Sequence, residues 1–279
     1  MGPNDILPMT AIAVSAGFLG SMLGLGGGII IIPALTLVFR VPFPVAVGAS
    51  IVSVIATSTS ATAVYIREGY VNLRLGLVLE LATVAGAVVG GFLGVWMNPR
   101  YLEALFGALM LYAGWNMLRA AGEVHPEPVP QSDEGFPHPH DHEFVDRASG
   151  RTLVYRPRAT LLGSAISAIA GLQSGMLGVG GGIIKVPVMN LIMGVPLKAA
   201  IATSNYMIGI TAATSAMVYY AHGKVVPLIA GPCAAGVLIG AQIGSRVGPR
   251  LKTAKLRWIF VALLVFASYQ MFRKALGAG

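Results

Sequence analysis

Residues 20–33 read GSMLGLGGGIIIIP and residues 174–187 read SGMLGVGGGIIKVP, so one pattern occurs twice, 154 residues apart. Nine of the fourteen positions are identical. Each copy places a run of glycines inside a long apolar segment. Glycine weakens a helix by about 1 kcal/mol relative to alanine, and bare backbone in lipid lacks hydrogen-bond partners. We therefore expect both helices to break here, beside a protected, wet cavity.

The composition predicts a membrane protein. Hydrophobic residues make up 55% of the 279 residues and charged residues 11%, whereas soluble domains carry about 25% charged residues. A membrane span needs about 20 apolar residues, and the first and fifth apolar runs are longer than that. We expect an all-α polytopic membrane protein in which these two segments are glycine-broken or re-entrant. The runs lie at 8–39, 43–66, 73–97, 101–119, 159–193, 195–221, 225–248 and 255–275.

The repeat extends beyond the glycine motif at the same offset. Pro42 matches Pro196, and Tyr65 matches Tyr219. Internal similarity at a fixed spacing indicates a duplicated structural unit. We expect a first membrane repeat at 1–119, a linker at 120–158 and a second membrane repeat at 159–279. Each repeat would contain one broken segment and three transmembrane helices.

The basic residues indicate how the repeats are oriented. If segments one and five enter and leave on the same side, thirteen Lys and Arg fall on one side and five on the other, whereas eight single crossings give eight against ten. The first division fits the positive-inside rule, so topology explains the net charge of +8 and we expect no nucleic-acid partner. An odd number of crossings per repeat makes the repeats inverted, as in many secondary transporters. Both termini would lie outside and the linker in the cytoplasm.

The linker is rich in proline and histidine. Its proline, its charge and its low hydrophobicity predict a flexible, solvated tether. The alternative is a transition-metal site, because imidazole and carboxylate groups are competent ligands. Alternating prolines disfavour a preformed chelate, so we expect no bound metal and no cofactor. The histidines are His125, His138, His140 and His142.

The glycine runs predict a binding site for an anion. Dense glycine exposes backbone N–H groups, and a helix that begins near Ile29 or Ile183 would add the positive end of its dipole. The alternative is close helix packing through small residues. Two copies at matched positions favour a site. The glycines concerned are Gly26, Gly27, Gly28, Gly180, Gly181 and Gly182.

Polar side chains follow each glycine motif in the next apolar run. Hydroxyl and amide groups can solvate an oxyanion without a fixed charge, so that the ligand can leave again. The alternative is that serine and threonine bond carbonyls of their own or neighbouring helices. The repeat favours five of these residues as substrate ligands, namely Ser50, Thr57, Ser204, Asn205 and Thr211.

Two charged residues lie within apolar runs. Lys185 follows the second glycine motif, and a lysine at membrane depth is by default a functional hypothesis, here as the counter-charge for an anion. The alternative is that Lys185 reaches the membrane interface. Glu80 is a candidate for carrying a coupling proton, and the alternatives are a structural ion pair with a lysine or an interfacial position.

The duplicated motif resembles that of the TauE/SafE family, also called the toluene sulfonate uptake permeases. The likeness lies in GLGGG at 24–28 and GVGGG at 178–182, each followed by Ile-Ile, a proline and a Val-Pro turn into a hydroxyl-rich helix. It covers both membrane repeats but not the linker. The resemblance implies a carrier in the bacterial inner membrane for sulfur-containing anions such as sulfite or organosulfonates like sulfoacetate, often as an exporter. The residues themselves indicate only an anion.

We therefore expect a secondary transporter that exports such anions by alternating access. The alternatives are an anion channel, a metal-ion transporter that uses the linker histidines and, ranked behind these, an intramembrane enzyme. All histidines except His222 lie in the linker, so no paired base for catalysis is evident and no enzymatic activity is expected. The expected partners are a small anion, the lipid bilayer and coupling protons, and a homo-oligomer is left open.

Overall fold

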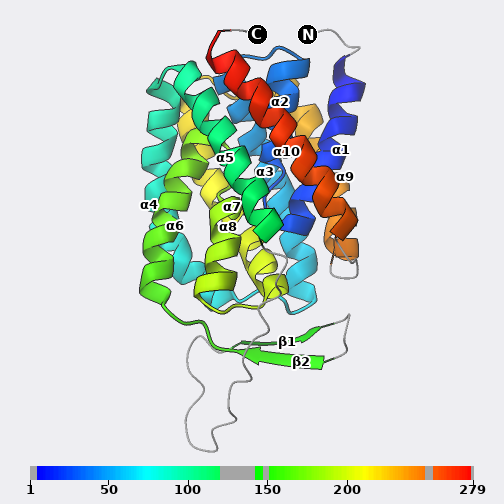
Figure 1. Cartoon of the computed structure of the whole chain (residues 1–279), viewed down its shortest axis with the longest axis vertical. Coiled ribbons are helices and arrows are strands. Elements are labelled where there is room, and N and C mark those ends of the chain that lie inside the picture. The colour runs from blue at the N-terminus through cyan, green and yellow to red at the C-terminus, as the bar shows by residue number, and fades with distance from the viewer. Residues whose placement is uncertain (1–4, 120–141, 147–150, 249–253, 278–279) are drawn as a thin grey trace, which may run out of the picture.

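The computed structural model describes residues 5–119, 142–146, 151–248 and 254–277, which form an all-α polytopic membrane protein as predicted. Figure 1 shows a bundle of long helices with a small two-stranded sheet at one end. The elements are α1 (Ile6–Leu23), α2 (Gly28–Pro33), the π-helical η2 (Ala34–Val38), α3 (Phe43–Arg67), α4 (Leu73–Trp96), α5 (Pro99–Arg119), β1 (His142–Asp146), β2 (Arg151–Tyr155), α6 (Thr160–Leu177), α7 (Gly182–Pro187), the π-helical η3 (Val188–Ile192), α8 (Leu197–Ala221), α9 (Pro227–Val247) and α10 (Ala254–Ala275). Five of these described helices, α1, α3, α4, α6 and α9, are long and apolar enough to cross a membrane.

Both over-long segments break at their glycines, which confirms the prediction. After α1 and α6 the backbone adopts positive φ angles, including +78° at Gly27 and +73° at Gly181. Residues with a Cβ atom rarely adopt this left-handed conformation, so the glycines allow the chain to change direction. The next helices, α2 and α7, begin directly afterwards, at Gly28 and Gly182.

Each segment then turns back along the helix it has just left. Gly27 packs against the backbone of Ala16 in α1, and Gly181 packs in the same way against α6. At the far end of the second segment, the Arg158 N–H donates to the oxygen of Met193 over 3.0 Å, so the start of α6 adjoins the end of η3. The first segment follows the same course, with η2 beside the start of α1. The two segments are therefore re-entrant.

The two repeats have matching elements at the expected offset. The helix α6 begins and ends 154 residues after α1, and the same offset relates α2 to α7, η2 to η3 and α3 to α8. Figure 1 shows α1 starting at the end of the bundle where α10 finishes, whereas α6 starts at the opposite end, beside the sheet. Inverted repeats would have this arrangement, and the inversion itself stays a prediction.

The repeats exchange helices. The helix α4 packs mainly against α6 and α8 of the second repeat, while α9 packs against α1 and α3 of the first. We call α1, α2, α3 and α9 the first packing group, and α4, α6, α7 and α8 the second packing group. The two groups meet where α3 lies against α8, and α5 pairs with α10 across the face seen in Figure 1.

Glycines allow the exchanged helices to approach closely. A Cβ atom added to Gly90 of α4 would lie 2.0 Å from the oxygen of Leu172 in α6. A Cβ atom added to Gly240 of α9 would lie 1.9 Å from the oxygen of Val14 in α1. These glycines bring helix backbones into direct contact, as small residues commonly do in membrane proteins.

Part of the predicted linker forms a packed element. The antiparallel strands β1 and β2 bury Phe144 and Tyr155, and the ring centroid of Phe144 lies 5.1 Å from that of Tyr70, between α3 and α4. His142 Nε2 lies 3.1 Å from the oxygen of Gly69. For these residues the structure differs from the expected flexible tether, because their aromatic side chains find a buried surface against this turn. The other linker histidines, His125, His138 and His140, lie outside the described residues.

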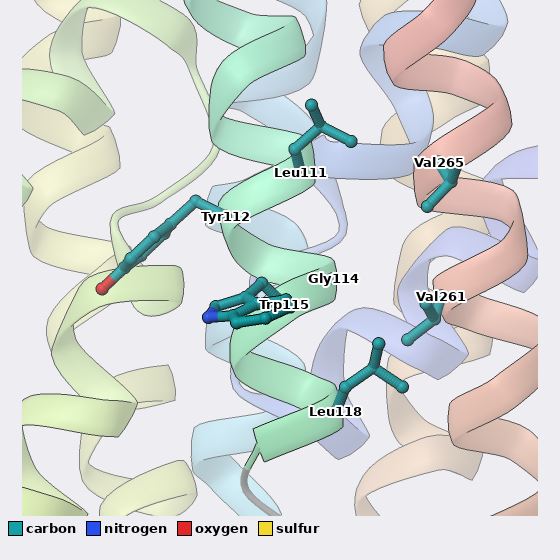
Figure 2. A pocket seen from close by; sticks show the side chains of 7 residues that line it. All are labelled: Leu111, Tyr112, Gly114, Trp115, Leu118, Val261 and Val265. Atoms are coloured by element: carbon teal, nitrogen blue, oxygen red, sulfur yellow. The ribbon is translucent and has the colours of Figure 1, made fainter.

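An apolar groove of about 380 Å³ opens between α5 and α10 (Figure 2). Leu111, Trp115 and Leu118 line it from α5, and Val261 and Val265 line it from α10. Such a mainly apolar lining suits contact with lipid acyl chains and contains no positively charged side chain. The candidate site must therefore be sought at the glycine breaks.

Candidate functional site

The two glycine breaks meet in the centre of the bundle. A Cβ atom added to Gly28 would lie 2.5 Å from the oxygen of Gly178, and one added to Gly182 would lie 1.9 Å from the oxygen of Gly24. Backbone of one packing group thus touches backbone of the other at two equivalent points. These contacts leave no room for a solute between the paired residues in the conformation described.

The breaks carry backbone donors without acceptors. Within the described part of the chain, the N–H groups of Gly26, Gly27 and Gly28 donate no hydrogen bond, and the same holds for Gly180, Gly181 and Gly182. Buried N–H groups are normally paired, and those at the start of a helix carry its positive partial charge. The two breaks therefore hold the uncommitted donors that an anion requires.

Two of the predicted serines hold the breaks together. Ser50 of α3 donates to the oxygen of Gly178 over 2.8 Å, and Ser204 of α8 donates to the oxygen of Gly24 over 3.1 Å. Each bond joins the first packing group to the second. Because a serine hydroxyl has a single proton, neither serine has a donor left for a substrate in this conformation.

The other predicted polar residues differ in their bonding. Thr57 lies beside Gly27 but donates to Ser53 of its own helix over 3.0 Å, which is the alternative that the sequence left open. Asn205 uses its amide nitrogen for the oxygens of Ser21 and Ile201, at 3.1 and 3.0 Å. Its buried Oδ1 has no partner, and this atom is an acceptor, not a donor for an anion. An anion would therefore reach these donors only after a rearrangement.

Lys185, Glu80 and Thr211 form one buried cluster. Lys185 Nζ lies 3.4 Å from Glu80 Oε2 and donates to Thr211 Oγ1 over 2.9 Å. Thr211 donates to Glu80 Oε1 over 2.6 Å, with the oxygen of Met207 as a second acceptor at 3.1 Å. The structure thus shows the ion pair that the sequence analysis gave as an alternative role for Glu80. Lys185 is 1% exposed and does not reach the surface of the protein.

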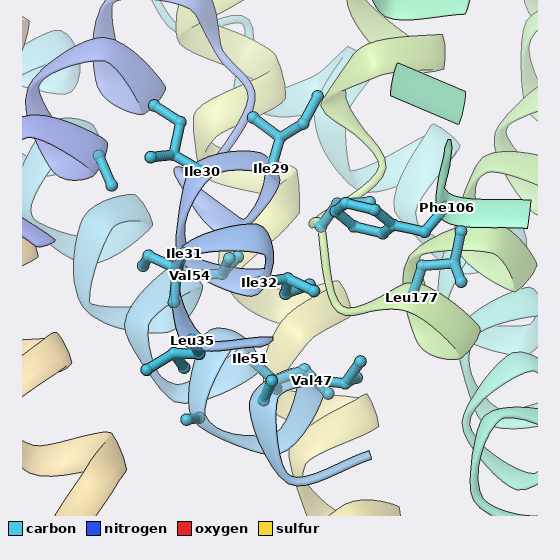
Figure 3. Close-up of a cluster of buried hydrophobic side chains, with 14 of the residues drawn as sticks. Ile29, Ile30, Ile31, Ile32, Leu35, Val47, Ile51, Val54, Phe106 and Leu177 are labelled. Carbon is cyan, nitrogen blue, oxygen red and sulfur yellow. The ribbon is translucent and has the colours of Figure 1, made fainter. Parts of the chain in front are cut away.

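Apolar side chains surround the breaks. Figure 3 shows Ile29 and Ile32 of α2 beside Phe106 of α5 and Leu177 at the end of α6. All four are buried, so water is excluded from one side of the first break. Hydrogen bonds in such surroundings are stronger than in water, and an unpaired polar group there is costly.

Two tyrosines belong to the site although the sequence analysis used them only to align the repeats. Tyr65 donates to the oxygen of Ser21 over 3.1 Å, and Tyr219 donates to the oxygen of Met176 over 3.0 Å. Both acceptors lie in the last turn of the helix before a glycine break, where carbonyls lack partners within the helix. The matched positions were the available signal, but the sequence does not show which helix end each ring faces.

Comparisons with known proteins find sequence similarity over nearly the whole chain. A sequence model of the family described as "Sulfite exporter TauE/SafE" matches residues 9–271. The "Probable membrane transporter protein YunE" of Bacillus subtilis (strain 168) is 28% identical over 94% of this chain and 96% of its own length.

Two further relatives come from other organisms. A "Probable membrane transporter protein" of Xylella fastidiosa (strain 9a5c) is 28% identical over 86% of this chain and 83% of its own length. The "Probable membrane transporter protein MJ0441" of Methanocaldococcus jannaschii is 25% identical over 93% of this chain and 92% of its own length. No solved structure matches the chain. The names indicate a multi-pass membrane transporter rather than an enzyme.

Proposed function

Because the chain belongs to the sulfite exporter TauE/SafE family, we propose that it is a secondary transporter that exports sulfur-containing anions by alternating access. The substrate class is sulfite or an organosulfonate of the sulfoacetate type. The family description supports sulfite, and the chemistry of the breaks supports an anion with several acceptor oxygens.

The observation that carries the proposal is the meeting of the two glycine breaks. Six glycine N–H groups without acceptors lie there, on both sides of the contacts that join Gly28 to Gly178 and Gly182 to Gly24. Lys185 follows the second break by one helical turn and supplies positive charge. A sulfonate or sulfite group placed between the breaks would accept from both sets of N–H groups.

The described conformation corresponds to a closed state in this mechanism. Ser50 and Ser204 join the packing groups, and separation of the groups would free both hydroxyls to bind the anion. The moving bodies are then the packing groups and not the sequence repeats, since α4 and α9 are exchanged. Access would then alternate as one packing group moves against the other.

The proposed setting is the bacterial inner membrane, with both termini outside and the linker in the cytoplasm. The re-entrant course of both broken segments supports inverted repeats, because each repeat then keeps an odd number of crossings. The positive-inside rule supports the orientation, since it places the more basic side in the cytoplasm. A homo-oligomer remains part of the proposal, with the apolar α5 and α10 face available for lipid or for a second copy.

Flux measurements on proteoliposomes test the function. We expect wild-type protein to release labelled sulfite or sulfoacetate faster than empty liposomes do, and Gly182→Ala to lose this flux because its Cβ atom meets the Gly24 carbonyl. Gly231→Ala is the matched control, since a Cβ atom there meets nothing within 4 Å. Thermal unfolding in detergent confirms that each variant is folded.

Several outcomes would contradict the proposal. Absence of flux with folded wild-type protein excludes this substrate class, and a chemically altered product indicates an enzyme. A conductance too large for a carrier indicates a channel. Loss of transport on deletion of 125–142, which removes all four linker histidines, indicates the metal-ion transporter that uses them.

A further inference from the structure

The buried cluster of Glu80, Lys185 and Thr211 is present in only the second of the two packing groups, to which the first repeat contributes α4. At the 154-residue offset, Lys185 corresponds to Ile31 and Glu80 corresponds to Ala234, while Thr211 corresponds to Thr57. Ile31 is 2% exposed, so the equivalent place in the first packing group is packed with apolar side chains. The fold therefore accommodates the same helix contacts without any charge.

A contribution to folding stability does not explain why Lys185 and Glu80 form a charged pair at this position. The side chains of Lys185 and Glu80 are 0% and 4% exposed, and replacing a buried ion pair by well-packed apolar residues is often neutral or stabilising. Ionisable residues at membrane depth generally mark transport or proton pathways. The first packing group shows that an apolar replacement was available to this chain.

The cluster adjoins the second glycine break. Lys185 lies in the first turn of α7, and its backbone N–H donates to the oxygen of Gly181 over 3.1 Å. Thr211 lies two helical turns after Ser204, the residue that bonds the Gly24 carbonyl. An anion at the second break would therefore compete with the Glu80 carboxylate for the Lys185 ammonium group.

We propose that the transported anion displaces Glu80 from Lys185 and that Glu80 takes up one proton when this happens. This inference rests on the proposed anion transport. In the empty state Lys185 and Glu80 carry opposite charges, so the cluster is neutral. When a singly charged anion pairs with Lys185, an ionised Glu80 would leave a net buried negative charge, which is costly. Protonation of Glu80 by a proton from the aqueous phase restores neutrality.

Thr211 can form hydrogen bonds both when Glu80 is ionised and when Glu80 is protonated. Its hydroxyl donates to the Glu80 carboxylate in the empty state and has Met207 oxygen as its other acceptor. Once Glu80 is protonated, the carboxyl group becomes a donor and Thr211 can turn to Met207 or to the anion. Displacement of Glu80 from Lys185 therefore requires only that the Thr211 hydroxyl proton turn to another acceptor.

Glu80 is the group whose protonation would couple to transport. Among described residues, Lys185 is the charged side chain that faces it. The packed helix α6 carries no charged residue, and Lys198 lies near the start of α8, about 20 Å along the helix from Thr211. Tyr206 of α8 contacts Gly76, one turn before Glu80.

This exchange of Glu80 for the anion at Lys185, with uptake of one proton, predicts that anion and proton cross the membrane together. At zero membrane potential, a difference of one pH unit would then accumulate a singly charged anion up to about tenfold on the alkaline side. Export occurs when the outward gradient of the anion exceeds the inward gradient of protons. The direction of transport follows the sum of the two gradients.

Proteoliposomes with an imposed pH difference test the exchange, with sulfite, sulfoacetate, acetate and chloride as probe anions. We expect wild-type protein to accumulate its anion with the pH difference and Glu80→Gln to equilibrate it without accumulation. Glu103→Gln is the control, because Glu103 is also a buried carboxylate in an ion pair, 3.1 Å from Lys274 Nζ, but lies away from the breaks. It should retain the accumulation of the wild type.

The double variant Glu80→Ala/Lys185→Ile copies the first packing group and tests the same inference without an unpaired charge. It should unfold at the wild-type temperature and show at least a tenfold loss of anion binding. Accumulation by Glu80→Gln, or wild-type binding by the double variant, overturns the exchange while leaving anion transport standing. If wild-type protein carries none of the four anions, the proposed function fails and the exchange fails with it.

Discussion

At the scale of single residues, the site depends on hydroxyl groups that bond carbonyls at the breaks. Ser50 bonds Gly178, and Ser204 bonds Gly24, so two equivalent bonds close the contact between the packing groups. The contacts of Gly28 with Gly178 and of Gly182 with Gly24, beside these bonds, are close steric contacts. Asn205 adds further bonds between the groups, since its amide nitrogen donates to the oxygen of Ser21 and its backbone oxygen accepts from Ser58. These bonds form the polar link that transport must break and re-form.

Replacing Ser50 by alanine should lower the free energy of unfolding by about 0.6–1.5 kcal/mol, the usual net value of one hydrogen bond in such settings. Thr59→Ala is the control, since the exposed Thr59 bonds only Ile55 of its own helix. Denaturation in mixed detergent, followed by circular dichroism, measures both changes. Equal stability of the two variants would show that the Ser50 bond does not join the groups.

The sequence predicted where the two helical segments break better than it predicted the hydrogen bonds of the polar residues nearby. The glycines at 26–28 and 180–182 were found because a run of glycines weakens a helix strongly and is therefore conspicuous inside an apolar segment. The bonding of Ser50 and Asn205 was not predictable, because a side chain can bond its own helix or another one, and only the packing decides. The pairing of Glu80 with Lys185 was one of the alternatives, and the residues are 105 positions apart in the chain.

At the scale of elements, close contact between helix backbones determines which glycines can be replaced by a larger residue. Gly90→Ala should destabilise the protein by about 1–3 kcal/mol, because overpacking against the Leu172 carbonyl forces α4 and α6 apart. Gly114→Ala in α5 meets only side-chain atoms at 3.9 Å and should be neutral or slightly stabilising, since alanine favours the helix.

Thermal unfolding of the two glycine variants in the same detergent provides the measurement. A similar change in both variants would mean that helix propensity, and not the contact between α4 and α6, governs the outcome. A loss confined to Gly90→Ala supports the close packing seen in the structure.

Element boundaries followed from the sequence where local chemistry sets them. Glycine and segment length predicted the breaks, and α2 begins at Gly28, one residue from the expected position. The strands β1 and β2 were not predicted, because their stability comes from contact with Tyr70 in a distant turn. Composition alone describes the linker as a whole and does not resolve a five-residue strand within it.

At the scale of the whole molecule, the packing groups should move as units. A disulfide between Ser58→Cys and Gly209→Cys would join α3 to α8, across the two groups, at sites whose Cβ atoms lie 3.3 Å apart. We expect its formation to stop transport, and its reduction to restore it. Disulfides need Cβ atoms about 3.5–4.5 Å apart, so a small adjustment suffices.

The matched control is a second engineered disulfide, which joins α4 to α8 inside the second packing group. Gly91→Cys and Val218→Cys place Cβ atoms 3.2 Å apart, and this disulfide should leave transport unchanged. Both pairs are built with Cys233→Ala, which removes the buried native thiol. If the control also stops transport, or the first pair does not, the moving bodies differ from these groups.

The sequence predicted two repeats but not the exchange of α4 and α9. Periodicity and offset identify equivalent helices, and they contain no information about which copy each helix packs against. The matched glycines at 90 and 244 showed that small residues recur, yet a recurring glycine is compatible with packing inside a repeat or between repeats. Only the three-dimensional contacts distinguish these cases.

The exchange of α4 and α9 also bears on how such a chain can arise by gene duplication. A half-length ancestor would have left the glycine-lined face of α4 without the α6 surface that covers it. Two separate ancestral copies would have had to interlock before a linker fused them. If the repeats are inverted, those copies entered the membrane in opposite orientations, and the fusion then fixed each copy in one orientation, after which the charges of one half could diverge from the other.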